Sequence, residues 1–140
     1  MKTLLIVMMN MVFLFAGFTA VRGASGAEKM AVSAGMNWLS LIDSGKYTES
    51  WRDASVLFRG AVTAEQWRAS LDGVRKPLGK PVKREMVNAE ESTALPGAPD
   101  GRYVVMTMQS VFEHKQFATE TVTVMLDNDG VWRAAGYFIK

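Results

Sequence analysis

The chain has 140 residues, of which 49% are apolar and 21% are charged, and this fits one globular domain and excludes a disordered chain. It has no cysteine, which excludes a disulfide scaffold, a thiolate zinc site and a cysteine nucleophile. Its 16 basic residues are scattered, and two of them, Lys2 and Arg22, lie in the leader described next. The remaining bases balance the 14 acids, so we expect no nucleic-acid partner.

Residues 1–27 have the pattern of a signal peptide. A basic start is followed by an apolar stretch shorter than the roughly 20 residues of a membrane-spanning helix, and then by small residues. We predict cleavage near Ala27, with cleavage after Gly23 or Ala24 as alternatives. An uncleaved membrane anchor is the competing interpretation. We therefore expect residues 28–140 to form a single exported domain, periplasmic or secreted, without membrane contact after cleavage.

Helical periodicity dominates the first half of this domain. Apolar residues at helical spacing predict a first helix over Glu28 to Asp43 and a short second helix from Tyr47 that extends to Phe58 if the periodicity continues. Thr63 and Gln66 form a capping box that begins a third helix, and Pro77 and Gly79 end it.

The second half alternates between apolar and polar residues, which is typical of strands. Four strands are predicted, roughly Val82–Glu91, Arg102–Glu113, Phe117–Asp127 and Val131–Ile139. Residues 95–101 form a turn-rich connector, and residues 127–130 form a hairpin turn. Helices followed by strands indicate an α+β fold, with the N-terminal helices packed on a curved four-stranded antiparallel sheet.

One face of the second strand is mixed in character. Tyr103, Val105 and Val111 point away from the predicted core and form an apolar patch on the outside of the sheet. Ordinary exposure and a homodimer interface explain this patch equally well, and a ligand surface explains it less well.

The tryptophans of the domain have two interpretations. They build the core, which is favoured because each indole buries on the order of 200 Å², or they line a hydrophobic ligand pocket. The candidate lining residues of such a pocket are Trp38, Trp51, Trp67, Tyr103 and Trp132.

The acids and the single histidine do not form a recognisable catalytic set. His114 lies in a predicted hairpin turn and is interpreted as a surface residue. Asp43, Glu49 and Asp53 lie near helix ends, where solvated surface positions are favoured over a buried acid–base pair. We therefore predict no catalytic residue, no metal site and no cofactor.

Four arginines recur through the second and third helices, at positions 52, 59, 68 and 75. Arg68 and Arg75 are seven residues apart and share a helix face. Such residues are able to grip an anionic ligand, but a solvated face that pairs with acids is favoured.

Four ordered blocks resemble a known family. The chain is similar to the bacterial domain-of-unknown-function family 4019 (DUF4019) over nearly all of residues 28–140, through WLxLIDxGKYxESW at 38–51, LPGAPDGxYVV at 95–105, ETV at 120–122 and WRxxGYFIK at 132–140. This family implies no known activity, so it supplies no site residues. The layout also resembles, more loosely, the nuclear-transport-factor-2-like and cystatin-like α+β superfamily, whose helices close the concave side of a curved sheet into a cone. Its members include isomerases, dehydratases, ligand binders and assembly modules.

Three functions remain open at this point. The first is an exported non-catalytic module that binds a small apolar ligand or an envelope protein, as a homodimer through the outer sheet face. The second is a small cofactor-free isomerase or hydrolase acting in the cone mouth. The third is a structural or stress-related envelope protein, which the sequence does not separate from the first.

Overall fold

The computed structural model describes residues 25–140, which form one helical layer and one sheet. The helices are α1 (Gly26–Asp43), α2 (Tyr47–Arg52), α3 (Val56–Ala61) and α4 (Ala64–Val74), followed by the short 3-10 helix η1 (Lys76–Leu78). The strands are β1 (Pro81–Ser92), β2 (Tyr103–Phe112), β3 (Lys115–Leu126) and β4 (Trp132–Ile139). Most of the predicted leader lies outside the described residues, and its last residues, 25–27, belong to the start of α1.

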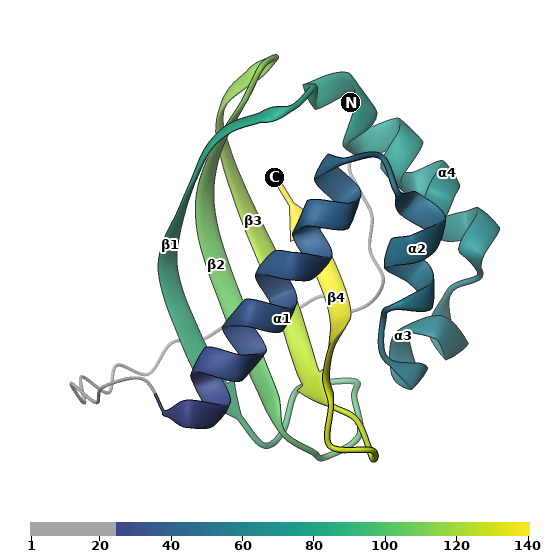
Figure 1. Cartoon of the computed structure of the whole chain (residues 1–140), viewed down its shortest axis with the longest axis vertical. Coiled ribbons are helices and arrows are strands. Elements are labelled where there is room, and N and C mark those ends of the chain that lie inside the picture. The colour runs from purple at the N-terminus through teal and green to yellow at the C-terminus, as the bar shows by residue number, and fades with distance from the viewer. Residues whose placement is uncertain (1–24) are drawn as a thin grey trace.

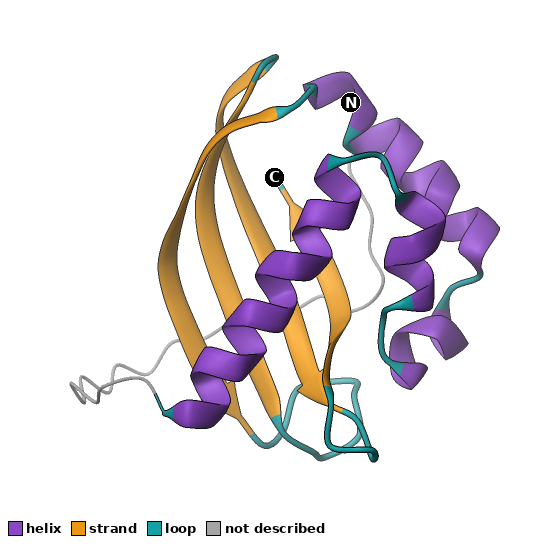
Figure 2. Ribbon diagram, viewed as in Figure 1, coloured by secondary structure: helices purple, strands orange, loops and turns teal. Residues whose placement is uncertain are grey.

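The four strands pair in chain order, β1-β2-β3-β4, and every pair is antiparallel. Figure 1 shows α1 lying across the concave side of the curved sheet, with α2, α3 and α4 beyond it, and Figure 2 shows the same helices gathered on one side of the strands. This arrangement confirms the predicted α+β fold. No helix within residues 25–140 is long and apolar enough to cross a membrane.

The core lies between α1 and the inner face of the sheet and contains three of the four tryptophans in buried positions. Trp38 stacks on Trp67 with ring centroids 5.7 Å apart, and Phe58 meets Trp67 edge-on at 4.9 Å. The indole nitrogens of Trp38 and Trp67 donate to the backbone carbonyl and the hydroxyl of buried Ser50, at 2.7 and 2.9 Å. The core interpretation of Trp38, Trp67 and Trp132 is therefore confirmed, since their apolar area is buried and the two indole N–H groups deep in the core are paired.

The predicted second helix is two helices, because Ser55 interrupts it. The Ser55 hydroxyl accepts a hydrogen bond from the Phe58 N–H at 3.1 Å and caps α3. The backbone N–H of Ser55 donates to Ala134 O in β4 at 2.8 Å, which joins the helical layer to the sheet edge. The capping box of Thr63 and Gln66 is confirmed at the start of α4.

The outer face of the sheet is less exposed than the sequence predicts. Residues 93–101 fold back over it, so that Leu95 packs with Tyr103 and Val105, and the Tyr103 hydroxyl donates to Pro99 O. Tyr103 is 1% and Val105 8% exposed, so the prediction that they form an exposed patch was wrong. The homodimer through this face stays a prediction.

Candidate functional site

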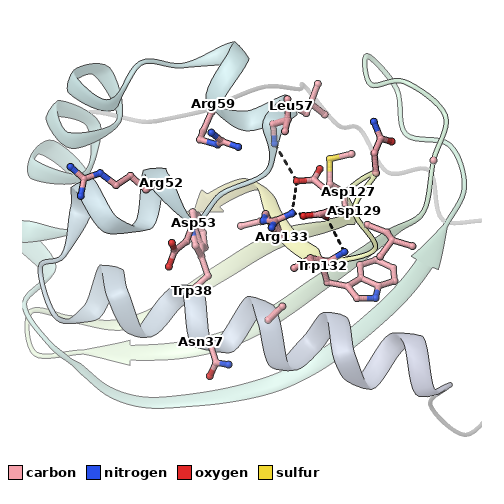
Figure 3. Close-up of a pocket in the computed structure, with 18 of the residues that line it drawn as sticks. Asn37, Trp38, Arg52, Asp53, Leu57, Arg59, Asp127, Asp129, Trp132 and Arg133 are labelled. Carbon is pink, nitrogen blue, oxygen red and sulfur yellow. Dashed lines mark hydrogen bonds and ion pairs between the residues drawn. The ribbon is translucent and has the colours of Figure 1, made fainter.

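A groove with a volume of about 1130 Å³ lies between the helices and the end of the sheet where β3 turns into β4 (Figure 3). Its walls come from α1, α2, α3, residues 99–101, the turn at 127–130 and the start of β4. The volume is slightly above the range of about 300–1,000 Å³ that is usual for small-molecule sites.

The groove has an apolar lining, which consists of Ala34, Trp38, Leu41, Val56, Leu57, Met125, Leu126, Val131, Trp132 and Ala134. The side chains nearest the core, such as Trp38 and Trp132, are buried, whereas Val56 and Val131 are exposed at the rim. Burial of apolar ligand surface here is worth about 25 cal/mol for each Å² removed from water.

The polar side of the groove is built around Arg133 of β4. Its Nη1 donates to Asp129 Oδ1 at 2.8 Å and to Asp127 Oδ2 at 3.1 Å (Figure 3). The hydrogen bond from Arg133 lowers the pKa of Asp129, and the bond to Asp129 raises the pKa of Arg133. Both acids of the turn already have a cationic partner, and the lowered pKa of Asp129 does not suit that carboxylate to proton transfer near neutral pH.

Two further arginines reach the groove from α2 and α3. Arg59 donates through Nε to Ala54 O at 3.1 Å, and Arg52 lies in the last turn of α2. Neither forms an ion pair with another residue in the range 25–140. Their guanidinium groups are thus available to a ligand.

The groove brings together two of the five pocket residues predicted from the sequence, Trp38 and Trp132. Trp67 lies deeper and borders a void of only about 10 Å³ beside Tyr137. Trp51 is half-buried, with its indole N–H donating to Val62 O, and Tyr103 lies on the opposite face of the sheet. Periodicity places these residues on the correct elements but does not reveal where the layers separate.

A second feature, absent from the sequence predictions, is a buried charge cluster. We use this name for the two carboxylates and two guanidinium groups that meet between α1 and the sheet, together with their two hydroxyl partners: Asp43, Arg75, Arg84, Ser110, Glu120 and Tyr137.

Arg84 bridges the two carboxylates of the charge cluster. It binds Asp43 through Nη1 and Nη2, at 2.8 and 3.0 Å, and Glu120 through Nε and Nη2, at 2.8 and 3.2 Å. Arg75 Nη2 donates to Asp43 at 2.7 Å and its guanidinium lies 4.7 Å from the centre of the Phe112 ring. This multidentate geometry is the strong form of a carboxylate–guanidinium contact.

Glu120 is the centre of the charge cluster and is 0% exposed. Besides Arg84 it accepts hydrogen bonds from the hydroxyl groups of Ser110 and Tyr137. Arg75 Nη1 lies 3.9 Å from Glu120 and also donates to the Tyr137 oxygen at 3.4 Å. The buried carboxylate therefore has the partners that burial of a charge requires.

Burial and the two arginines shift the pKa of Asp43 in opposite directions. Burial alone would raise the pKa of Asp43, but the hydrogen bonds and charges of Arg84 and Arg75 lower it below its ordinary value. Burial and the nearby Glu120 charge raise the pKa of Tyr137 well above 10. Hence the carboxylate of Asp43 is ionised and the phenol of Tyr137 is neutral at physiological pH.

The charge cluster corrects two sequence interpretations. Asp43 and Arg75 were expected on solvated surfaces, but Arg75 is 3% exposed and Asp43 is mostly buried. They lie inside because Asp43 is the last residue of α1 and Arg75 directly follows α4, both of which pack in the domain, and the sheet then supplies opposite charges. The missed signal was Glu120, which lies between Ala118 and Val122 in the row of inward-facing residues of β3.

His114 is exposed in the turn between β2 and β3, as predicted. Within the described part of the chain, no group of three or more His, Asp or Glu side chains is arranged to hold a metal ion.

The fold and the groove define a small α+β domain with an open ligand-sized cavity. The chain matches the family described as "Protein of unknown function (DUF4019)" over residues 34–137, and it belongs to this family. The match includes α1 from Ala34 onward and nearly the whole sheet. No curated protein and no solved structure matches the chain significantly.

Proposed function

We propose that this protein is an exported, non-catalytic module whose groove binds a small ligand with an apolar body. The observation that carries the proposal is the groove itself, because a volume of about 1130 Å³ lined by apolar side chains together with arginines, aspartates and asparagines has the mixed composition of a ligand site. The charge cluster, another concentration of ionisable groups, is largely buried between α1 and the sheet.

An isomerase or hydrolase acting in the cone mouth is less well supported. Such an enzyme needs an acid or base with a suitable pKa beside a space for substrate. In the groove, Asp127 and Asp129 are held by Arg133. In the charge cluster, the adjoining void beside Tyr137 is only about 10 Å³, which is at the lower limit for one water molecule.

Export is supported by the signal-peptide pattern of residues 1–27. Ser25 and Gly26 are exposed at the start of α1 and Ala27 packs against the core, so cleavage after Ala27 would remove the cap and the first residues of this helix. Fractionation of cells that express the full chain, followed by intact-mass measurement, tests this part. A cytoplasmic chain of full-length mass would contradict it.

Ligand binding is tested with Nile red, a neutral apolar dye whose emission rises in apolar surroundings. We expect saturable binding by the folded protein. Leu57→Glu, which places a charge in the groove, weakens binding at least about tenfold. Val82→Glu is the matched control, because Val82 is 68% exposed on β1 and outside the groove. Equal binding by both variants would show that the dye binds elsewhere and would overturn the assignment.

A further inference from the structure

We infer that the groove accepts an amphiphilic anion, whose tail lies on the apolar lining and whose head group is bound by Arg59 and Arg133. The inference rests on the proposed binding function and adds the chemical class of the ligand. It starts from the arginines, because they are the groove's cations and their donors are only partly used.

Arg59 is positioned to donate to a ligand. Its Nε bond to Ala54 O orients the guanidinium group, and no described residue accepts from its two terminal nitrogens. A guanidinium that is fixed through Nε and free at both Nη atoms matches the two oxygens of a carboxylate.

Arg133 is positioned opposite, on β4. It uses Nη1 for Asp127 and Asp129, and no described residue accepts from its Nε or Nη2. Figure 3 shows the side chains of Arg59 and Arg133 projecting into the same gap between α3 and the β3–β4 turn. One head group is therefore able to meet donors from both walls.

Four aspartates line the groove beside its three arginines, so anion binding here depends on directed N–H donors and not on net charge. Asp127 and Asp129 are engaged by Arg133, at 3.1 and 2.8 Å. Asp53 and Asp100 also line the groove and are exposed, and in Figure 3 the Asp53 carboxylate turns away from the side on which Arg59 and Arg133 lie. The gap itself is bordered by unused N–H donors.

The lining next to these donors explains why the ligand is an amphiphile and not a simple ion. Leu57 precedes Arg59 by two residues in α3, and Trp132 precedes Arg133 in β4, and all four side chains line the groove. An apolar chain attached to the head group would cover Leu57 and the exposed rim residues Val56 and Val131. A small inorganic anion would leave this surface wet.

Calorimetry with three linear amphiphiles of nearly equal chain length tests the inference, each used below the concentration at which it forms micelles. The probes are decanoate, decanol and decyltrimethylammonium, which differ in head-group charge. We expect decanoate to bind about tenfold more tightly than decanol, since charged hydrogen bonds are among the stronger ones. Arg59→Gln removes this preference, whereas Arg68→Gln, on the exposed side of α4 and outside the groove, keeps it.

The outcomes are distinct. Equal binding of decanoate and decanol, a preference for decyltrimethylammonium, or an unchanged preference in Arg59→Gln would each overturn the anionic head group. If Nile red binds in the groove while decanoate gains nothing, the proposed function stands and this inference fails. If neither Nile red nor any amphiphile binds, both fail together.

Discussion

The charge cluster makes Glu120→Gln the most informative single substitution in this protein. The side chain keeps its size, so no cavity forms, but the two guanidinium groups of Arg75 and Arg84 then face only one carboxylate, Asp43. The new amide also directs N–H groups toward Arg84 or the Ser110 and Tyr137 hydroxyls, which already donate to this position. A buried positive charge is left without compensation.

The expected loss of stability follows from this imbalance. Removal of one partner from a buried ion pair costs about 3–5 kcal/mol, because the remaining charge stays buried. Domains of this size have total stabilities of about 5–15 kcal/mol, so Glu120→Gln removes a large part of the free energy of unfolding. The estimate applies because Glu120 is fully buried and Arg75 nearly so.

Urea unfolding followed by tryptophan fluorescence measures this loss, since Trp38 and Trp67 are buried. The matched control is Glu85→Gln, the same change on exposed β1, where Lys83 is 2.9 Å away and both side chains are more than half exposed. That pair contributes at most about 1 kcal/mol. Equal losses in Glu120→Gln and Glu85→Gln would refute the reasoning that the buried charges are interdependent.

Four further predictions follow from other contacts. Because the pKa of Tyr137 is raised well above 10, the unfolded chain loses this proton first, and the free energy of unfolding falls as the pH rises past 10. Urea unfolding at alkaline pH should show a shallower fall in Tyr137→Phe. An unchanged dependence of stability on pH would contradict the assignment. In Gly35→Ala, the added Cβ collides with the Met106 sulfur, so thermal unfolding should report a loss of about 1–3 kcal/mol, and no loss would mean that Met106 moves aside freely. A chain that begins at Ser25 keeps the side-chain cap of α1 and should be about 1 kcal/mol more stable than one that begins four residues later, and equal melting curves would argue against the cap. If the outer sheet face forms a homodimer, Phe138→Glu shifts sedimentation toward the monomer, and a wild type that is monomeric at high concentration ends that hypothesis.

Local signals made most of the fold predictable from the sequence. The capping box at Thr63 and the hairpin turn that ends at Gly130, where φ is +80°, depend on neighbouring residues only, and both occur as expected. Ser55 was the exception among local signals, because it serves as a helix cap and also donates to Ala134 of β4. Such a contact between distant segments leaves no mark on periodicity.

The candidate site was less predictable, for a related reason. Trp38 and Trp132 lie on an apolar face whether they build the core or line a pocket. They border the groove only because the helices and the β3–β4 turn are separated in space. Glu120 was hidden in the opposite way, since a charged residue at an inward position is meaningful only once Arg84 and Arg75 are known to lie across from it. Tertiary neighbours, not local pattern, decide both cases.

The charge cluster also affects the alignment of the strands. Apolar residues repeat every second position, so a slide by two residues keeps the same side chains inward and is barely penalised by hydrophobicity. In the native pairing Arg84 lies opposite Ser110, and both reach Glu120 on the next strand. A slide by two residues would move Arg84 by about 7 Å relative to β2 and away from Glu120. An unpaired charge would then be buried in the interior. These ionic partners thus favour one strand register over others that hydrophobic burial alone would permit.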